Sequence, residues 1–229
     1  MPDPTNRLPP GAERYLVHAI GPGAAPPRSV EVEFHGRLRL GPDRSWMRFT
    51  ARETIRVGDS FEFVARARGG PLVVTTQDRY LDGRGESQVR LFGLIPVATR
   101  RGPDQDRAMR ARLVVESVWL PSTFLPANGA KWEAADGGLR VSVPVHGEDV
   151  SAAMDIGADG GLRAMRVERW SDLTFDGSWA MVPFESRVAA ERRFGACTIP
   201  SRLAATWWAG TDRAFTFFEA TVDDARFST

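Results

Sequence analysis

Apolar and polar residues alternate along much of this chain, with a period of two that is typical of strands with one buried face. Val30, Val32 and Phe34, for example, are separated by single glutamates. Glycine-rich and aspartate-rich turn signals divide this part of the chain into short segments. The pattern predicts a meander of five antiparallel strands over residues 29–100.

One long segment, residues 103–120, has helical periodicity instead. Met109, Leu113 and Glu116 share one stripe of this helix, and Pro121 ends it. Glu116 is therefore a carboxylate on a face that is otherwise apolar. Any sheet formed by the rest of the chain is expected to bury a face against this helix.

The remaining residues predict a second group of strands and a short first helix. Strand periodicity returns over residues 131–228, where turn signals again separate the segments. The last three strands are expected at residues 184–194, 202–208 and 214–227. Residues 1–28 are predicted to hold a short helix and a connector, and residues 29–229 to form a single domain.

Composition and charge exclude several functions. Lys and Arg number 30 and Asp and Glu number 29, so a net charge of +1 argues against nucleic-acid binding through bulk charge. Cys197 is the only cysteine, which excludes an internal disulfide and a cysteine-based metal site. The three histidines lack partners at metal-ligand or triad spacing. We expect no metal and no cofactor.

The chain has no obvious membrane or export segment. Its first residues, Met1-Pro2-Asp3-Pro4-Thr5, contain no apolar stretch, and no window approaches the roughly 20 apolar residues of a membrane span. We therefore expect a cytoplasmic protein without a transmembrane segment.

Polar residues on apolar faces are the candidate functional groups. Glu53 lies on the apolar face of its predicted strand, as Glu116 does on the helix. A buried carboxylate has to be paired, hydrogen-bonded or protonated, so each is expected either to meet an arginine or to contact a ligand. Asp78 and Asp82 fall on one face of another strand and form a second candidate pair.

Five short motifs lie along the chain: Trp46-x-x-Phe49, Asp78-x-Tyr80-x-Asp82-Gly83-x-Gly85, Gly93-Leu94-x-Pro96-Val97, Gly102-Pro103-Asp104 and Glu116-x-x-Trp119-Leu120-Pro121. Together they resemble an uncharacterised bacterial family of the domain-of-unknown-function type. The resemblance covers most of residues 28–227 and implies no catalytic residues.

The order of elements and a late hairpin at residues 194–200 also resemble the lipoprotein-carrier (LolA-like) superfamily. In that superfamily a strongly curved antiparallel sheet wraps around helices and forms an apolar cavity. The resemblance implies a mainly β (α+β) fold, a single curved sheet or half-barrel of about ten to twelve strands around the central helix. It implies architecture more than function.

These observations predict non-catalytic binding of a hydrophobic or lipid-like small molecule between sheet and helix. Phe49, Phe63, Tyr80 and Trp119 are expected to form the walls, with Glu116 as a polar anchor. No nucleic-acid partner is expected, and the sequence leaves the oligomeric state open.

Two alternatives stay open at this point. An enzyme on the same scaffold would need two carboxylates to converge in an open cleft as acid and base. The candidates are the pairs Glu53 with Glu116 and Asp78 with Asp82. A structural or partner-binding module would instead show an exposed aromatic patch around Trp207-Trp208.

Overall fold

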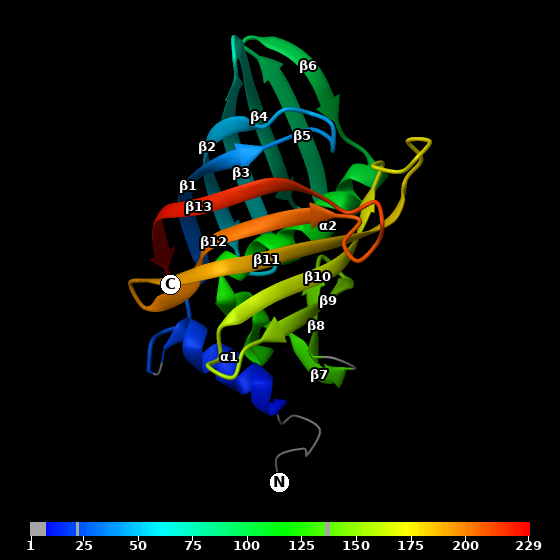
Figure 1. Ribbon diagram of the computed structural model, residues 1–229. Coiled ribbons are helices and arrows are strands. Elements are labelled where there is room, and N and C mark those ends of the chain that lie inside the picture. The colour runs from blue at the N-terminus through cyan, green and yellow to red at the C-terminus, as the bar shows by residue number, and fades with distance from the viewer. Residues whose placement is uncertain (1–7, 22, 136–137) are drawn as a thin grey trace.

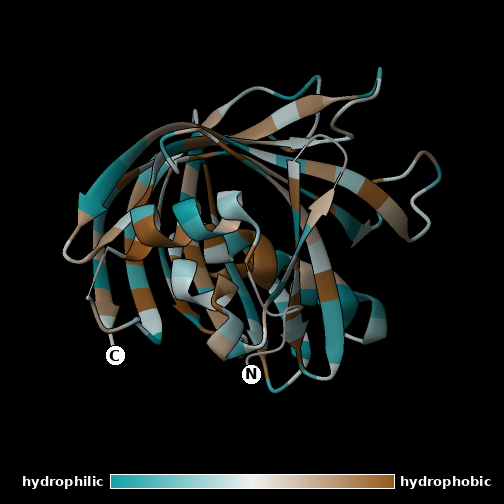
Figure 2. Cartoon of the chain, turned by 90° about the horizontal axis from the view of Figure 1, so that it is seen from below, coloured by the Kyte–Doolittle hydropathy of each residue, from teal (hydrophilic) through white to brown (hydrophobic). Residues whose placement is uncertain are grey.

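The computed structural model describes residues 8–21, 23–135 and 138–229. Its main feature is one antiparallel sheet of 13 strands, which curves around a central helix (Figures 1 and 2). This arrangement confirms the predicted fold class. The first half of the sheet contains β1 (Ser29–Leu38), β2 (Met47–Arg56), β3 (Ser60–Gly69), β4 (Leu72–Leu81), β5 (Arg84–Leu91) and β6 (Ile95–Arg100).

The second half of the sheet is another meander. It contains β7 (Lys131–Ala135), β8 (Gly138–Val145), β9 (Glu148–Ile156), β10 (Leu162–Ser171), β11 (Ala180–Phe194), β12 (Cys197–Trp207) and β13 (Phe215–Ser228). The two meanders meet in the middle of the sheet, where β1 pairs with β13. The first and last strands of the chain are thus neighbours, and β6 and β7 form the two edges.

The strand count exceeds the expected ten to twelve because residues 88–98 form parts of two strands. The chain reverses at Phe92 and Gly93, whose φ angles of 53° and 74° are both positive, as in a tight hairpin turn. Pro96 lies in the resulting edge strand β6, next to a register shift. An edge strand suits a proline, because proline cannot donate a hydrogen bond to a ladder.

The described residues form two α-helices, which pack against the sheet. Helix α1 (Pro10–Ile20) lies at one end of it and buries an apolar stripe that includes Tyr15 and Leu16 (Figure 1). Helix α2 (Pro103–Glu116) lies on the concave side. The α-helix ends four residues earlier than the sequence predicts, because a 3-10 turn, Ser117–Trp119, replaces its last part. Two further 3-10 turns, Pro121–Phe124 and Pro126–Asn128, lead to β7.

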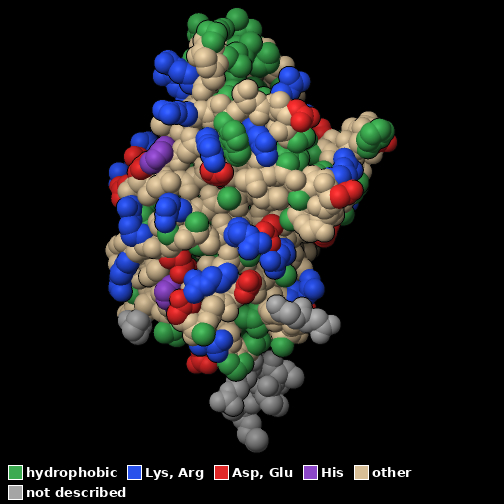
Figure 3. Space-filling view, in the orientation of Figure 1, with side chains coloured by type: hydrophobic (Ala, Val, Ile, Leu, Met, Phe, Trp, Pro, Cys, Tyr) green, Lys and Arg blue, Asp and Glu red, His purple; other side chains and the backbone are tan. Residues whose placement is uncertain are grey.

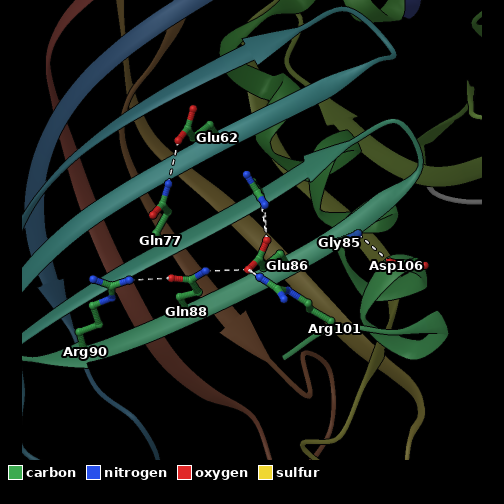
Figure 4. Close-up of polar contacts among 9 residues, drawn as sticks. Glu62, Gln77, Gly85, Glu86, Gln88, Arg90, Arg101 and Asp106 are labelled. Atoms are coloured by element: carbon green, nitrogen blue, oxygen red, sulfur yellow. Dashed lines mark hydrogen bonds and ion pairs between the residues drawn. The ribbon is translucent and has the colours of Figure 1, made fainter. Parts of the chain in front are cut away.

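Gly85 lets α2 approach β5 closely. A Cβ atom at this position would lie 2.5 Å from the backbone oxygen of Gln105 in the first turns of α2. The Gly85 backbone N–H also donates to Asp106 Oδ1 at 2.7 Å (Figure 4). Gly85 therefore has a packing role, because the absence of a side chain lets α2 lie against β5.

Glu86 on β5 forms a network of hydrogen bonds near the edge of the sheet. Glu86 accepts hydrogen bonds from Gln88, Arg101 and Arg79 (Figure 4). The bonds from Gln88 and Arg101 lower the pKa of Glu86 to about 2. This carboxylate therefore stays ionised and connects β4 and β5 with the segment that leads into α2.

We predict that Gly85→Ala lowers the free energy of unfolding by about 1–3 kcal/mol, the usual cost of overpacking. The added methyl group would collide with the backbone of α2. Chemical denaturation monitored by circular dichroism would measure the change. Gly41→Ala is the matched control, because its Cβ would lie 3.5 Å from its nearest neighbour, the flexible Arg44 side chain, in an exposed turn. Equal stability of Gly85→Ala and the wild type would contradict the prediction.

Candidate functional site

A cavity of about 260 Å³ lies between the concave face of the sheet and the C-terminal end of α2. Aromatic and aliphatic side chains form most of its wall. The lining residues are Phe34, Leu38, Arg39, Leu40, Glu53, Phe63, Thr76, Asp78, Arg112, Val115, Glu116, Trp119, Arg169, Phe184, Ser186, Leu203, Ala205, Trp207, Phe217 and Phe218.

Arg112 is the centre of the polar part of this wall. Its Nη1 donates to Asp78 Oδ2 at 2.5 Å, and its Nε donates to Glu116 Oε1 at 2.9 Å. The guanidinium also lies over the rings of Phe61 and Phe63, with its carbon 5.0 and 4.8 Å from their centroids. Burial alone would lower the pKa of Arg112, but the two carboxylates outweigh it and raise the pKa above its usual value.

Glu53 faces the same cavity from β2 without a hydrogen-bond partner. The residue is fully buried, and neither carboxyl oxygen has a partner among the described residues. Burial, followed by the negative charge of Glu116, raises its pKa well above the ordinary value of 4.5, although Arg112 acts in the opposite direction. Burial and the neighbouring negative charge therefore favour the protonated, neutral form of Glu53.

Arg169 supplies a second cation in the lining of the cavity. It comes from β10, and its guanidinium carbon lies 4.8 Å from the ring centroids of both Phe184 and Trp207. Burial, together with the nearby positive charge of Arg112, lowers its pKa to about 9. At neutral pH the side chain is still charged.

Three of the five residues expected to bind a ligand line this cavity, namely Phe63, Glu116 and Trp119. Phe49 lies behind the wall, where its ring stacks on Phe218 with 4.9 Å between centroids. Tyr80 lies elsewhere in the core. Its hydroxyl oxygen accepts a hydrogen bond from Arg110 at 3.3 Å, and its ring packs against His146.

Three of the four candidate carboxylates lie close together. Glu53, Asp78 and Glu116 surround Arg112, whereas Asp82 lies exposed in the turn between β4 and β5. Asp78 and Glu116 are engaged by the same guanidinium, which is the arginine pairing that the sequence left open. No group of three or more His, Cys, Asp or Glu side chains in the described ranges is placed to hold a metal ion.

The two adjacent tryptophans have different surroundings, because β12 ends at Trp207 and Trp208 begins the following turn with a φ angle of 58°. Trp207 lines the cavity, while Trp208 lies outside it, under the guanidinium of Arg213. Trp208 also donates a hydrogen bond to the backbone oxygen of Leu173 at 3.0 Å. This side chain therefore anchors the loop between β10 and β11.

Sequence reasoning missed Arg112 and Arg169. Arg112 lies one helical turn before Glu116, so the spacing of an i,i+4 ion pair could have identified it. Arg169 follows the buried Val167 by two positions and shares its face of the strand. The rule that singled out Glu53, a charge on an apolar face, applies equally to Arg169.

The cavity reaches the end of the sheet at which β1 finishes. Leu40, which lines the cavity, is 74% exposed. Other exposed apolar side chains lie in the loops and strand ends on this side of the sheet, namely Leu72, Phe92, Leu94, Ile95, Leu173 and Phe175. Figure 3 shows a hydrophobic cluster over the β5 and β6 end of the sheet.

Comparison with known proteins gives a family but no assigned activity. The model of a family of unknown function, DUF6544, matches residues 1–220. This match confirms the resemblance to an uncharacterised family that the sequence motifs suggested. No curated protein matches the chain. None of the helices in the described part of the chain is long and apolar enough to cross a membrane.

Three solved structures are similar in architecture. An outer membrane lipoprotein-sorting protein domain from Vibrio parahaemolyticus is 12% identical, with a TM-score of 0.48 over 88% of this chain and 86% of that one. A DUF1329 family protein from Desulfovibrio piger is 10% identical, with a TM-score of 0.49 and coverage of 95% and 91%. A LolA superfamily protein from Nitrosomonas europaea is 9% identical, with a TM-score of 0.45 and coverage of 96% and 92%.

We predict that Glu53→Gln stabilises the protein increasingly as the pH rises above 4.5. In the wild type, the folded state keeps a proton on Glu53 that the unfolded chain loses above this pH. Folding then becomes less favourable by up to about 1.4 kcal/mol per pH unit until the folded-state pKa is reached. Glutamine does not ionise, so this loss is absent.

Urea unfolding of the wild type and Glu53→Gln between pH 4 and pH 8 would measure the difference. Glu168→Gln is the control, because Glu168 is an exposed glutamate on β10. Its stability is expected to follow that of the wild type at every pH. A constant difference between Glu53→Gln and the wild type would show that Glu53 is ionised in the folded protein.

Proposed function

Because this chain belongs to the DUF6544 family, whose function is unknown, we propose a function from its own cavity: non-catalytic binding of a hydrophobic or lipid-like small molecule. The supporting observation is a space of about 260 Å³ enclosed mainly by aromatic and aliphatic side chains on the concave face of the sheet. Ligand sites usually combine such walls with a few polar groups.

The tryptophan at the end of α2 presents only its apolar surface to a ligand. Trp119 is 1% exposed, and its indole Nε1–H donates to the backbone oxygen of Pro200 at 3.1 Å. Its polar atom is therefore already satisfied. Phe63 and Trp119 contact the ligand in this proposal, and Glu116 marks the polar side of the cavity.

The volume limits the size of the ligand. Pockets for drug-sized molecules span roughly 300–1,000 Å³, and this cavity is slightly smaller. A single short acyl chain suits the space better than a lipid with several chains. Leu40 lines the cavity and is exposed, so it extends the apolar surface of the cavity to the outside of the protein.

We predict that filling part of the cavity weakens ligand binding. Ala205 lines the cavity, so Ala205→Leu would occupy part of the space. Native mass spectrometry of the purified protein, followed by lipid extraction, would detect a bound apolar molecule or added 1-decanol. We expect at least about tenfold weaker binding in Ala205→Leu, equivalent to the loss of about 1.4 kcal/mol.

Ala204→Leu is the matched control for this experiment. Ala204 is the preceding residue on β12, and its side chain points to the opposite face of the sheet. It should bind like the wild type. If none of the three proteins retains a co-purified molecule or binds 1-decanol, the proposed function is wrong.

A further inference from the structure

Arg169 is a buried cation without an ion-pair partner among the described residues. The residue is 9% exposed, and its Nε has no hydrogen-bond acceptor among the described residues. The other buried carboxylates besides Glu53 each contact an arginine; they are Asp78, Glu86, Asp106 and Glu185. No such contact joins a described carboxylate to Arg169.

This arrangement is energetically unfavourable in the empty cavity. A buried charge loses its hydration, and the loss is offset only when an opposite charge and hydrogen bonds replace the water. The rings of Phe184 and Trp207 hold the guanidinium in place through cation–π contacts, but they accept no hydrogen bond at its edge. The donors of Arg169 are thus oriented and unused, and the side chain lines the cavity.

We propose that Arg169 binds the anionic head group of an amphiphile whose apolar chain occupies the cavity. The ligand class is a single-chain carboxylate or phosphate monoester. This inference rests on the proposed function, because it names the chemistry of the ligand for the same cavity.

The geometry of the guanidinium favours these head groups. Arginine presents parallel N–H donors that match the two oxygens of a carboxylate or a phosphate. Arg112 cannot serve the same purpose, because Asp78 and Glu116 already accept its hydrogen bonds. The raised pKa of Glu53 favours its neutral form, which reduces repulsion of an anionic ligand by this carboxyl group.

Binding of matched ten-carbon ligands would test the proposal. Isothermal titration calorimetry at pH 7, below the micelle concentrations, would compare decanoate and decyl phosphate with neutral 1-decanol. We expect at least one of the two anions to bind the wild type about tenfold or more tightly than 1-decanol does, as for a ligand that gains hydrogen bonds to a charged group. The better of the two anions identifies the head group.

Replacing Arg169 would show whether this residue causes the preference for an anion. Arg169→Met keeps an apolar side chain of similar length and is expected to reduce the preference for the anion to about threefold or less, with 1-decanol affinity within about threefold of the wild type. Its melting temperature should equal or exceed that of the wild type, because an unpaired buried charge has been removed. Arg202→Met, on the outer face of β12, is the control and should keep the preference.

The binding results distinguish a failure of the role of Arg169 from a failure of the proposed function. Equal affinity of the wild type for the anions and 1-decanol would overturn the role of Arg169 and leave the proposed function standing. An anion preference that survives in Arg169→Met would place the head group elsewhere and also overturn the inference. Absence of binding by all three ligands would overturn both. If Arg169→Met does not fold, the affinities of the wild type still decide whether an anion is preferred.

Discussion

The interaction on which the site depends is the buried ion pair network around Arg112. A guanidinium inside an apolar interface is destabilising unless its donors are used, and here Asp78 on β4 and Glu116 on α2 accept them. The network therefore fixes the C-terminal part of α2 against the concave face of the sheet. It also affects a neighbouring group, because the negative charge of Glu116 adds to the effect of burial in raising the pKa of Glu53.

The cavity follows from the way in which one helix is packed inside a large curved sheet. Helix α2 is held close to β5 at Gly85, and the 3-10 turn that follows it is anchored by the hydrogen bond from Trp119 to Pro200. A helix is narrower than the concave surface of a sheet with 13 strands, so these contacts leave some of that surface unfilled. Aromatic rings form the sides of the space, and Arg112 and Arg169 give it a polar wall.

The sequence predicted the architecture better than the site. Alternation and turn signals located most strands, and helical spacing located α2, since both patterns depend on neighbouring residues. The hairpin at Phe92 was missed because its turn lies within what reads as one interrupted strand. Tyr80 shows the main difficulty, because a buried aromatic residue can face any part of a large core. Contacts such as that of Arg112 with Asp78 join residues 34 positions apart, and no local pattern contains them.

A crystal structure of the protein grown with 1-decanol would test the central claim most directly, namely that the concave face of the sheet encloses a ligand-binding space. We expect electron density for the alkyl chain between Trp119 and Trp207, with the contacts of Arg112 to Asp78 and Glu116 unchanged. A cavity closed by Trp207 or Phe217, with the alcohol absent or bound only on the outer surface, would contradict it.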